Sequence, residues 1–264
     1  MSNALAWAAE SPVDRGSRQR LWWEIAIVLG LSLGQSAVYS IVSIIDRATQ
    51  STPLADQKTE VNPAQSSREV FDFLYQVLGN LFPLFAVALV VYLLWQPQRS
   101  GFRRIGLDLT RPGRDLAGGG LLFLVIGVPG ILFYAVTRLL GITVTVEAST
   151  LDAHWWTVPV LILAALRAAL QEEVIVVGYL FTRLRQLGWG KWTIILAAAV
   201  LRGSYHLYQG FGPFVGNAVM GVVFGWCYTR WGWVMPLVIA HTIIDIVSFV
   251  GYPLAVAWWP SVFA

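Results

Sequence analysis

Seven apolar stretches divide this sequence, and they constrain its fold more than any other feature. A helix of about 20 apolar residues crosses the hydrocarbon layer of a bilayer. Of the 264 residues, 56% are apolar and only 12% are charged, whereas globular domains carry about 25% charged residues. A soluble enzyme, a disordered chain and a disulfide scaffold are therefore excluded. The stretches cover residues 21–45, 71–95, 116–141, 157–182, 192–208, 213–229 and 233–251.

These stretches predict an all-α fold, a polytopic transmembrane bundle of about seven or eight helices. Pro83 predicts a kink inside the second stretch. Gly118, Gly119 and Gly120 predict that a neighbouring helix approaches the third stretch closely. The last two stretches are short enough to be re-entrant, and the sequence does not decide whether the tail at 252–264 spans.

The same pattern divides the chain into four parts. We expect a cytoplasmic N-terminal tail at 1–20 and then the first two helices at 21–95, which enclose a polar loop at 46–70. A basic cytoplasmic loop follows at 96–115, and a membrane domain occupies 116–264. Because the polar loop contains two prolines, we expect no regular structure in it.

Basic residues predict the orientation of the bundle, since they concentrate in cytoplasmic segments. With a cytoplasmic N-terminus, the inner segments hold twelve basic residues and the outer loop holds three. The inner twelve are Arg15, Arg18, Arg20, Arg99, Arg103, Arg104, Arg111, Arg114, Arg183, Arg185, Lys191 and Arg230. We therefore expect a multi-pass protein of the cell membrane, the plasma membrane of a bacterium, whose N-terminus lies inside.

Charge and cysteine content exclude other classes of function. The net charge of +3 is too small to indicate binding to nucleic acid. Cys227 is the single cysteine, so the chain can form neither an internal disulfide nor a cysteine-based metal cluster. The expected partners are the lipid bilayer and a membrane protein or peptide substrate, and the oligomeric state stays open.

Three of the later stretches each contain a pair of polar side chains that are costly inside a bilayer. A charge at the membrane centre costs about 2.5–3.5 kcal/mol even on the insertion scale, so it indicates a functional site. The first pair is adjacent, and its members point about 100° apart around a helix. The other two pairs are spaced i, i+4 and each share a helix face. The pairs are Glu172 and Glu173, Arg202 and His206, and His241 and Asp245.

Carboxylates and imidazoles in a closed apolar pocket suit hydrolysis. A glutamate beside a histidine can take a proton from water, and a second histidine can stabilise the oxyanion. A divalent metal such as Zn²⁺, held by Glu172, His206 and His241, is an open alternative. The sequence contains neither HExxH nor GxSxG, so it supports neither a zincin nor a serine hydrolase.

The segment EEVIVVGYL, the histidine of RGSYH and the segment HTIID together resemble the CPBP family of intramembrane proteases, also called the CAAX protease or Abi family. The family pattern is EExxxR, then FxxxH, then HxxxN or HxxxD on successive helices. The resemblance covers about residues 100–251, and it implies that 116–264 is a catalytic membrane domain. In this chain Val177 occupies the position of the family arginine, and Arg202 that of the phenylalanine. We hypothesise that the guanidinium has moved to the neighbouring helix, where it pairs with Glu173.

By this resemblance Glu172 is the general base and Glu173 supports it. His206 holds the attacking water, while His241 and Asp245 form or orient the oxyanion site. The implied function is an intramembrane endopeptidase that cleaves a membrane-associated protein or peptide, with or without a metal. The alternatives are a non-catalytic membrane scaffold of the same family and a proton-coupled transporter.

Overall fold

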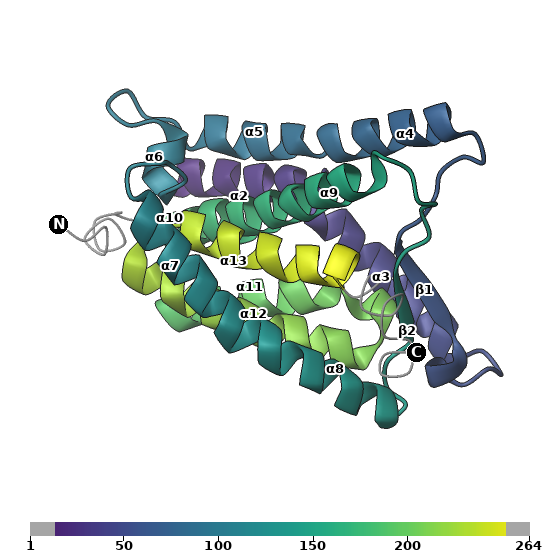
Figure 1. The fold of residues 1–264 in the computed structure, drawn as a ribbon. Helices are drawn as coiled ribbons and strands as arrows, with labels where there is room; N and C mark the ends of the chain where they lie inside the picture. The colour runs from purple at the N-terminus through teal and green to yellow at the C-terminus, as the bar shows by residue number, and fades with distance from the viewer. Residues whose placement is uncertain (1–13, 252–264) are drawn as a thin grey trace.

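The computed structural model describes residues 14–251, and its helices follow the apolar stretches of the sequence (Figure 1). The tail at 252–264 lies outside the described residues. The helices are α2 (Arg15–Gly30), α3 (Leu33–Ala48), α4 (Glu69–Leu81), α5 (Leu84–Leu93), α6 (Gly101–Ile105), α7 (Pro112–Leu122), α8 (Val128–Leu139), α9 (Thr157–Glu172), α10 (Leu180–Gln186), α11 (Lys191–Ser204), α12 (Phe211–Trp231) and α13 (Met235–Ile246). Shorter 3₁₀ or π segments are η1 (Leu54–Asp56), η2 (Phe123–Gly127), η3 (Glu173–Tyr179), η4 (Leu207–Gln209) and η5 (Val247–Gly251). The strands are β1 (Lys58–Asn62) and β2 (Thr145–Ser149).

The predicted all-α bundle is confirmed. Within residues 14–251, three helical segments are long and apolar enough to cross a membrane: Glu69–Leu93, Pro112–Leu139 and Phe211–Trp231. A fourth forms if the bent pair α2 and α3 is one span. The segment from α9 to α10 carries the charged residues, and α11 has only 14 residues. The count of seven or eight spanning helices and the side on which the N-terminus lies stay predictions.

The first apolar stretch is not the single helix that we predicted. It forms α2 and α3, whose axes are bent by 59° at a short break. The hydroxyl of Ser32 donates to the carbonyl oxygen of Val28 at 2.6 Å. A serine that bonds back to the preceding turn in this way bends a helix. In the second stretch, Pro83 lies between α4 and α5, at the site of the predicted kink.

The polar loop at 46–70 contains regular structure, so our prediction there was wrong. Residues 58–62 form β1, which pairs in parallel with β2, and Lys58 is opposite Thr145. The partner strand lies more than eighty residues away, so local turn signals could not reveal the pairing. Helix α2 begins at Arg15, α6 forms at 101–105 and α7 begins at Pro112. The division of the chain into four parts stays a prediction.

Glycines permit the helices around the site to pack closely, as the sequence predicted for the third stretch. A Cβ on Gly119 of α7 would lie 2.5 Å from the Ile239 side chain of α13. A Cβ on Gly221 of α12 would lie 2.9 Å from the Cα of Ala199 in α11. Both separations are shorter than real Cβ contacts, so only glycine permits these helix pairs to approach this closely.

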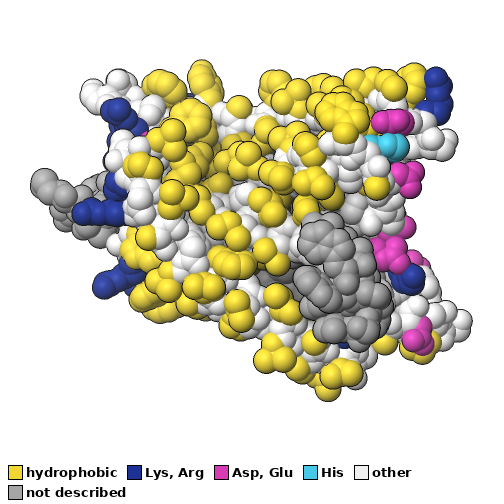
Figure 2. All heavy atoms as spheres, in the orientation of Figure 1, with side chains coloured by type: hydrophobic (Ala, Val, Ile, Leu, Met, Phe, Trp, Pro, Cys, Tyr) yellow, Lys and Arg dark blue, Asp and Glu magenta, His cyan; other side chains and the backbone are white. Residues whose placement is uncertain are grey.

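The surface agrees with a bundle that sits in a membrane. Apolar side chains cover the visible flank of the helices, and basic side chains gather at the end near the N-terminus (Figure 2). Acidic side chains gather at the opposite end, around β1 and β2 (Figure 2). Exposed apolar side chains of this flank include Leu124, Ile131 and Leu132 in η2 and α8. This distribution of charge is the one that the predicted orientation requires.

Candidate active site

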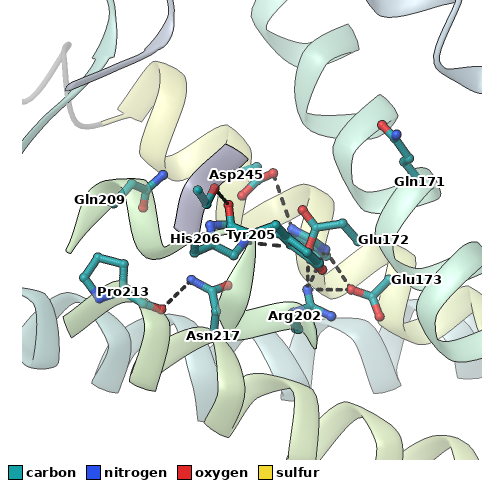
Figure 3. Close-up of polar contacts among 12 residues, drawn as sticks. Gln171, Glu172, Glu173, Arg202, Tyr205, His206, Gln209, Pro213, Asn217 and Asp245 are labelled. Carbon is teal, nitrogen blue, oxygen red and sulfur yellow. Dashed lines mark hydrogen bonds and ion pairs between the residues drawn. The ribbon is translucent and has the colours of Figure 1, made fainter. Parts of the chain in front are cut away.

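The six polar residues singled out from the sequence converge at one place in the bundle, where η3, α11, η4 and α13 meet (Figure 3). Glu172 ends α9, and Glu173 begins the π segment η3. A π segment interrupts the regular α-helical ladder, and such interruptions are frequent at functional sites. Both carboxylates point toward α11 and α13, while Gln171 extends away from them (Figure 3).

The two adjacent carboxylates have different partners, as their angular separation on the helix predicted. The Tyr205 hydroxyl donates to Glu172 Oε2 at 2.8 Å. Glu173 Oε1 lies 2.7 Å from Arg202 Nη2 and 2.8 Å from His241 Nδ1. The Tyr205 hydroxyl is thus the shortest contact of Glu172, whereas Glu173 has its shortest contact with the Arg202 guanidinium, which lies 3.3 Å from Glu172 as well.

Arg202 forms the buried centre of the cluster. Its Nη2 atom contacts Glu173 at 2.7 Å and Glu172 Oε2 at 3.3 Å, and its side chain is 1% exposed. The predicted pairing of Arg202 with Glu173 is confirmed. A charged pair is stable in such surroundings only while both members are present. In the position of the family arginine, Val177 is buried among apolar residues.

His241 connects Glu173 with Asp245. Its Nε2 atom lies 3.5 Å from Asp245 Oδ2, one turn further along α13. Its Nδ1 atom also lies 3.1 Å from Arg202 Nη2. A guanidinium only donates and a carboxylate only accepts, so one Nδ1 atom cannot satisfy both neighbours. The shorter contact, to Glu173, assigns the Nδ1 proton to that hydrogen bond.

The remaining side chains form the accessible part of the cluster. His206 Nε2 lies 3.9 Å from Glu172 Oε2, too far for a direct hydrogen bond. The side chains of Glu172, His206 and Asp245 are 10%, 19% and 17% exposed, whereas that of Glu173 is 0% exposed. Two groups result: a partly exposed set that can meet a substrate, and the buried pair Glu173 and Arg202 beneath it.

Sequence reasoning missed Tyr205. The residue lies between Arg202 and His206 in RGSYH, but the search for pairs spaced i, i+4 passed over it. Its backbone carbonyl accepts a hydrogen bond from Ser40 Oγ at 2.9 Å, so α3 braces the end of α11 that carries the site. A signal was present, because a tyrosine hydroxyl near membrane carboxylates needs a buried partner.

The donors do not fit a resident metal ion. Within residues 14–251, no group of three or more His, Cys, Asp or Glu side chains is arranged to hold one. Of the proposed ligands, Glu172 has the Arg202 guanidinium 3.3 Å away, and His241 directs Nδ1 to Glu173. A neighbouring cation opposes the binding of a second one. We therefore derive no chemical step through a metal.

Comparison with known families now adds to this geometry. A model of the family "Type II CAAX prenyl endopeptidase Rce1-like" matches residues 154–247. Residues 154–247 form an Rce1-like domain. The match spans about a third of the chain and agrees with the resemblance to CAAX proteases. No curated protein and no solved structure gave a significant match.

The Rce1-like domain contains every residue of the cluster. It begins beside α9 and ends just after α13, so the helices that supply the carboxylates, the guanidinium and both histidines all lie within it. The family points to proteolysis at a membrane as the general activity.

Proposed function

We propose that this protein is an intramembrane endopeptidase in which Glu172 activates water. The observation that carries the proposal is the position of Glu172 Oε2. It lies 2.8 Å from the Tyr205 hydroxyl and 3.9 Å from His206 Nε2, at the partly exposed edge of an otherwise buried polar cluster. A carboxylate in that place has one oriented neighbour on each side and remains accessible to a substrate.

The first step is attack by water on the peptide carbonyl. A water molecule in contact with both Glu172 and His206 gives its proton to the Glu172 carboxylate as its oxygen bonds to the carbonyl carbon. General-base catalysis of this kind contributes about 10²–10⁴-fold. Tyr205 keeps the carboxylate oriented, because its hydroxyl occupies one lone pair of Oε2.

The second step breaks the bond between the carbonyl carbon and nitrogen. Negative charge that develops on the carbonyl oxygen is stabilised by His241 in its doubly protonated form, whose Nδ1–H donates to Glu173 at 2.8 Å and whose Nε2–H, 3.5 Å from Asp245, turns to the oxyanion. One preorganised donor at this position is worth about 10²–10³-fold. Glu172 then returns the proton to the departing nitrogen, and the products are an amine and a carboxylic acid, which gives up its remaining proton to solvent.

Arg202 acts beneath the reacting atoms as a positioning residue. Its guanidinium compensates the charge of Glu173 at 2.7 Å, and Glu173 in turn fixes the Nδ1 side of His241 at 2.8 Å. In this proposal, Arg202 of α11 supplies the compensating cation that the family pattern places at the position of Val177.

The experiment that tests the proposal is a proteome-wide comparison of protein termini. Membranes from cells that express the wild type are compared with membranes that contain Glu172→Gln at equal abundance. We expect new termini with the wild type only. The matched control is Glu147→Gln, the same chemical change on β2, outside the site, and it should reproduce the wild-type termini.

Identical termini in all three samples, with each protein folded and inserted, would contradict proteolysis and favour the scaffold function. Uptake of a solute that collapses with the proton gradient would favour the transporter instead. The substrate class proposed is a membrane-associated protein or peptide, and the termini identify it directly.

A further inference from the structure

A cavity lined by apolar and polar side chains lies beside α9 and has no role in the reaction described above. Its volume is about 550 Å³, and it lies between the segment at 61–65, helix α4 and helix α9. Most of its lining comes from the loop and from α4, and α9 contributes Arg167. A cavity of this size accommodates a small ligand or a short piece of peptide.

Arg167 is a half-buried cation that forms no direct ion pair, and the carboxylates of Glu172 and Asp245 act on it only from a greater distance. Its Nε donates to Asn80 Oδ1 at 3.2 Å and its Nη1 to Gln171 Oε1 at 3.2 Å, both neutral acceptors. No carboxylate among residues 14–251 forms an ion pair with it. A cation within an apolar helix of a membrane protein normally pairs with an anion or marks a substrate path.

The amides around the cavity already have partners. Asn80 donates to the carbonyl oxygen of Gln76 at 2.8 Å, and Gln76 donates to the carbonyl oxygen of Pro63 at 2.9 Å. The remaining donor is Nη2 of Arg167, which has no partner among the described residues. The hydrogen bonds that Arg167 donates to Asn80 and to Gln171 fix the plane of the guanidinium and leave Nη2 available.

The available Nη2 donor of Arg167 favours a carboxylate as its ligand. A single guanidinium with Nη2 unoccupied matches one carboxylate in charge and can donate to one of its oxygens, whereas phosphate sites in proteins commonly use clusters of arginines. Acidic side chains gather at the end of the molecule around β1 (Figure 2). Because these acidic side chains repel an anion, any attraction for a carboxylate ligand must come from direct contact with Arg167.

The cavity is also close to the reacting groups. Arg167 lies five residues before Glu172 on the same helix, a rise of about 7.5 Å at 1.5 Å per residue. At 100° per residue the two positions lie about 140° apart around the helix, so one bound peptide reaches both only if it crosses the face of α9 between them.

We propose that Arg167, held by Asn80 and Gln171, is a specificity site that binds a carboxylate of the peptide substrate. This inference rests on the proposed endopeptidase function. The carboxylate comes from one of two sources, the C-terminus of the substrate or an acidic side chain. The site contributes affinity and selects which peptides are positioned at Glu172.

The test measures peptide binding to the full-length protein in detergent, with Glu172→Gln as the background so that the probe stays intact. The probe is a fluorescently labelled apolar tetrapeptide in three forms: a free C-terminal acid, a C-terminal amide, and an amide with one internal glutamate. Anisotropy gives the dissociation constants. We expect the acid, the glutamate peptide or both to bind about 10- to 100-fold more tightly than the plain amide, the range for a charged hydrogen-bonded pair.

Arg167→Gln should remove this preference, and Arg167→Lys should retain part of it because the charge remains. The matched control is Arg230→Gln, which removes an exposed arginine at the end of α12, and it should keep the full preference. If Arg167→Gln does not fold, Arg167→Lys together with the comparison of acid and amide still decides the matter.

Equal binding of all three peptides, or binding of none, overturns the proposal. So does a preference that persists in Arg167→Gln. Cleavage is measured in parallel with Glu172 intact. A protein that binds the carboxylate peptides preferentially but cleaves no peptide would retain this site and contradict the proposed function. Equal cleavage of all three peptides would support the proposed function and contradict this site.

Discussion

Replacing Arg202 by methionine should destabilise the protein more than any comparable change at its surface. The side chain is 1% exposed, and its Nη2 atom contacts Glu173 at 2.7 Å and Glu172 at 3.3 Å. Methionine has a similar length and fills most of the same space, so the substitution chiefly removes charge. Two adjacent carboxylates then remain, of which Glu173 is fully buried.

The magnitude follows from the cost of an uncompensated buried charge. Removing one partner of a buried ion pair costs about 3–5 kcal/mol. For a chain of this size, 1 kcal/mol shifts the unfolding temperature by about 2–4 °C. We therefore expect Arg202→Met to unfold about 6–20 °C below the wild type.

The assay is thermal unfolding of the purified protein in detergent, followed by intrinsic tryptophan fluorescence. Arg230→Met is the matched control, because it makes the same substitution at an exposed position of α12. The double variant Arg202→Met with Glu173→Gln removes both charges of the pair. Replacement of a whole buried pair by neutral groups is often close to neutral, so the double variant should recover much of the lost stability.

Two results would refute this reasoning. One is an unfolding temperature for Arg202→Met within about 2 °C of the wild type, which is less than 1 kcal/mol. The other is a double variant no more stable than the single one. Either result would mean that the carboxylates do not depend on this guanidinium, and the positioning role given to Arg202 would fall with it.

Three further predictions concern other parts of the fold. Tyr205→Phe should lower kcat about 10- to 100-fold with little change in unfolding temperature, because it removes a charged hydrogen bond to Glu172; a cleavage assay on an identified substrate measures the loss. Gly221→Ala should cost about 1–3 kcal/mol, since the new Cβ would lie 2.9 Å from the Cα of Ala199; thermal unfolding that matched the wild type would contradict the packing of α11 on α12. Asp14 caps α2, and backbone N–H donors in the first turn hold its pKa below 3.8. A carboxyl with a lowered pKa stabilises above its unfolded pKa and loses that effect as the pH falls through the folded value. Asp14→Ala should therefore speed hydrogen exchange in the first turn of α2 at pH 7, and the difference should shrink as the pH falls below 3.8.

The sequence by itself determined that the chain is a helical membrane bundle and which residues meet inside it. Both conclusions have a local physical origin. An apolar stretch of about 20 residues has few alternatives to a helix in lipid, because every backbone polar group must be paired within the segment. Charged pairs on three apolar helices are costly unless they face one another, so Glu172, Arg202 and His241 could be expected at one site. The i, i+4 spacing correctly placed His241 and Asp245 on one face of α13, whereas the shared helix face predicted for Arg202 and His206 was wrong, because α11 ends at Ser204 and His206 precedes η4.

Only the tertiary structure decided the contacts that involve distant or unremarkable residues. The parallel pairing of β1 with β2 joins segments more than eighty residues apart, and no local pattern encodes such a partner. The bend between α2 and α3 lies where the Ser32 hydroxyl donates to the carbonyl oxygen of Val28 and where Gly34 approaches the backbone of Leu29. Tyr205 is a partner of Glu172 because α11 ends at Ser204, which places the next residue beside that carboxylate. The sequence does not distinguish Arg167 from the other arginines in apolar stretches. Only the structure shows that it lines a cavity formed largely by α4. Long-range packing sets these distances, and a hydrogen bond depends on tenths of an ångström that a one-dimensional pattern does not contain.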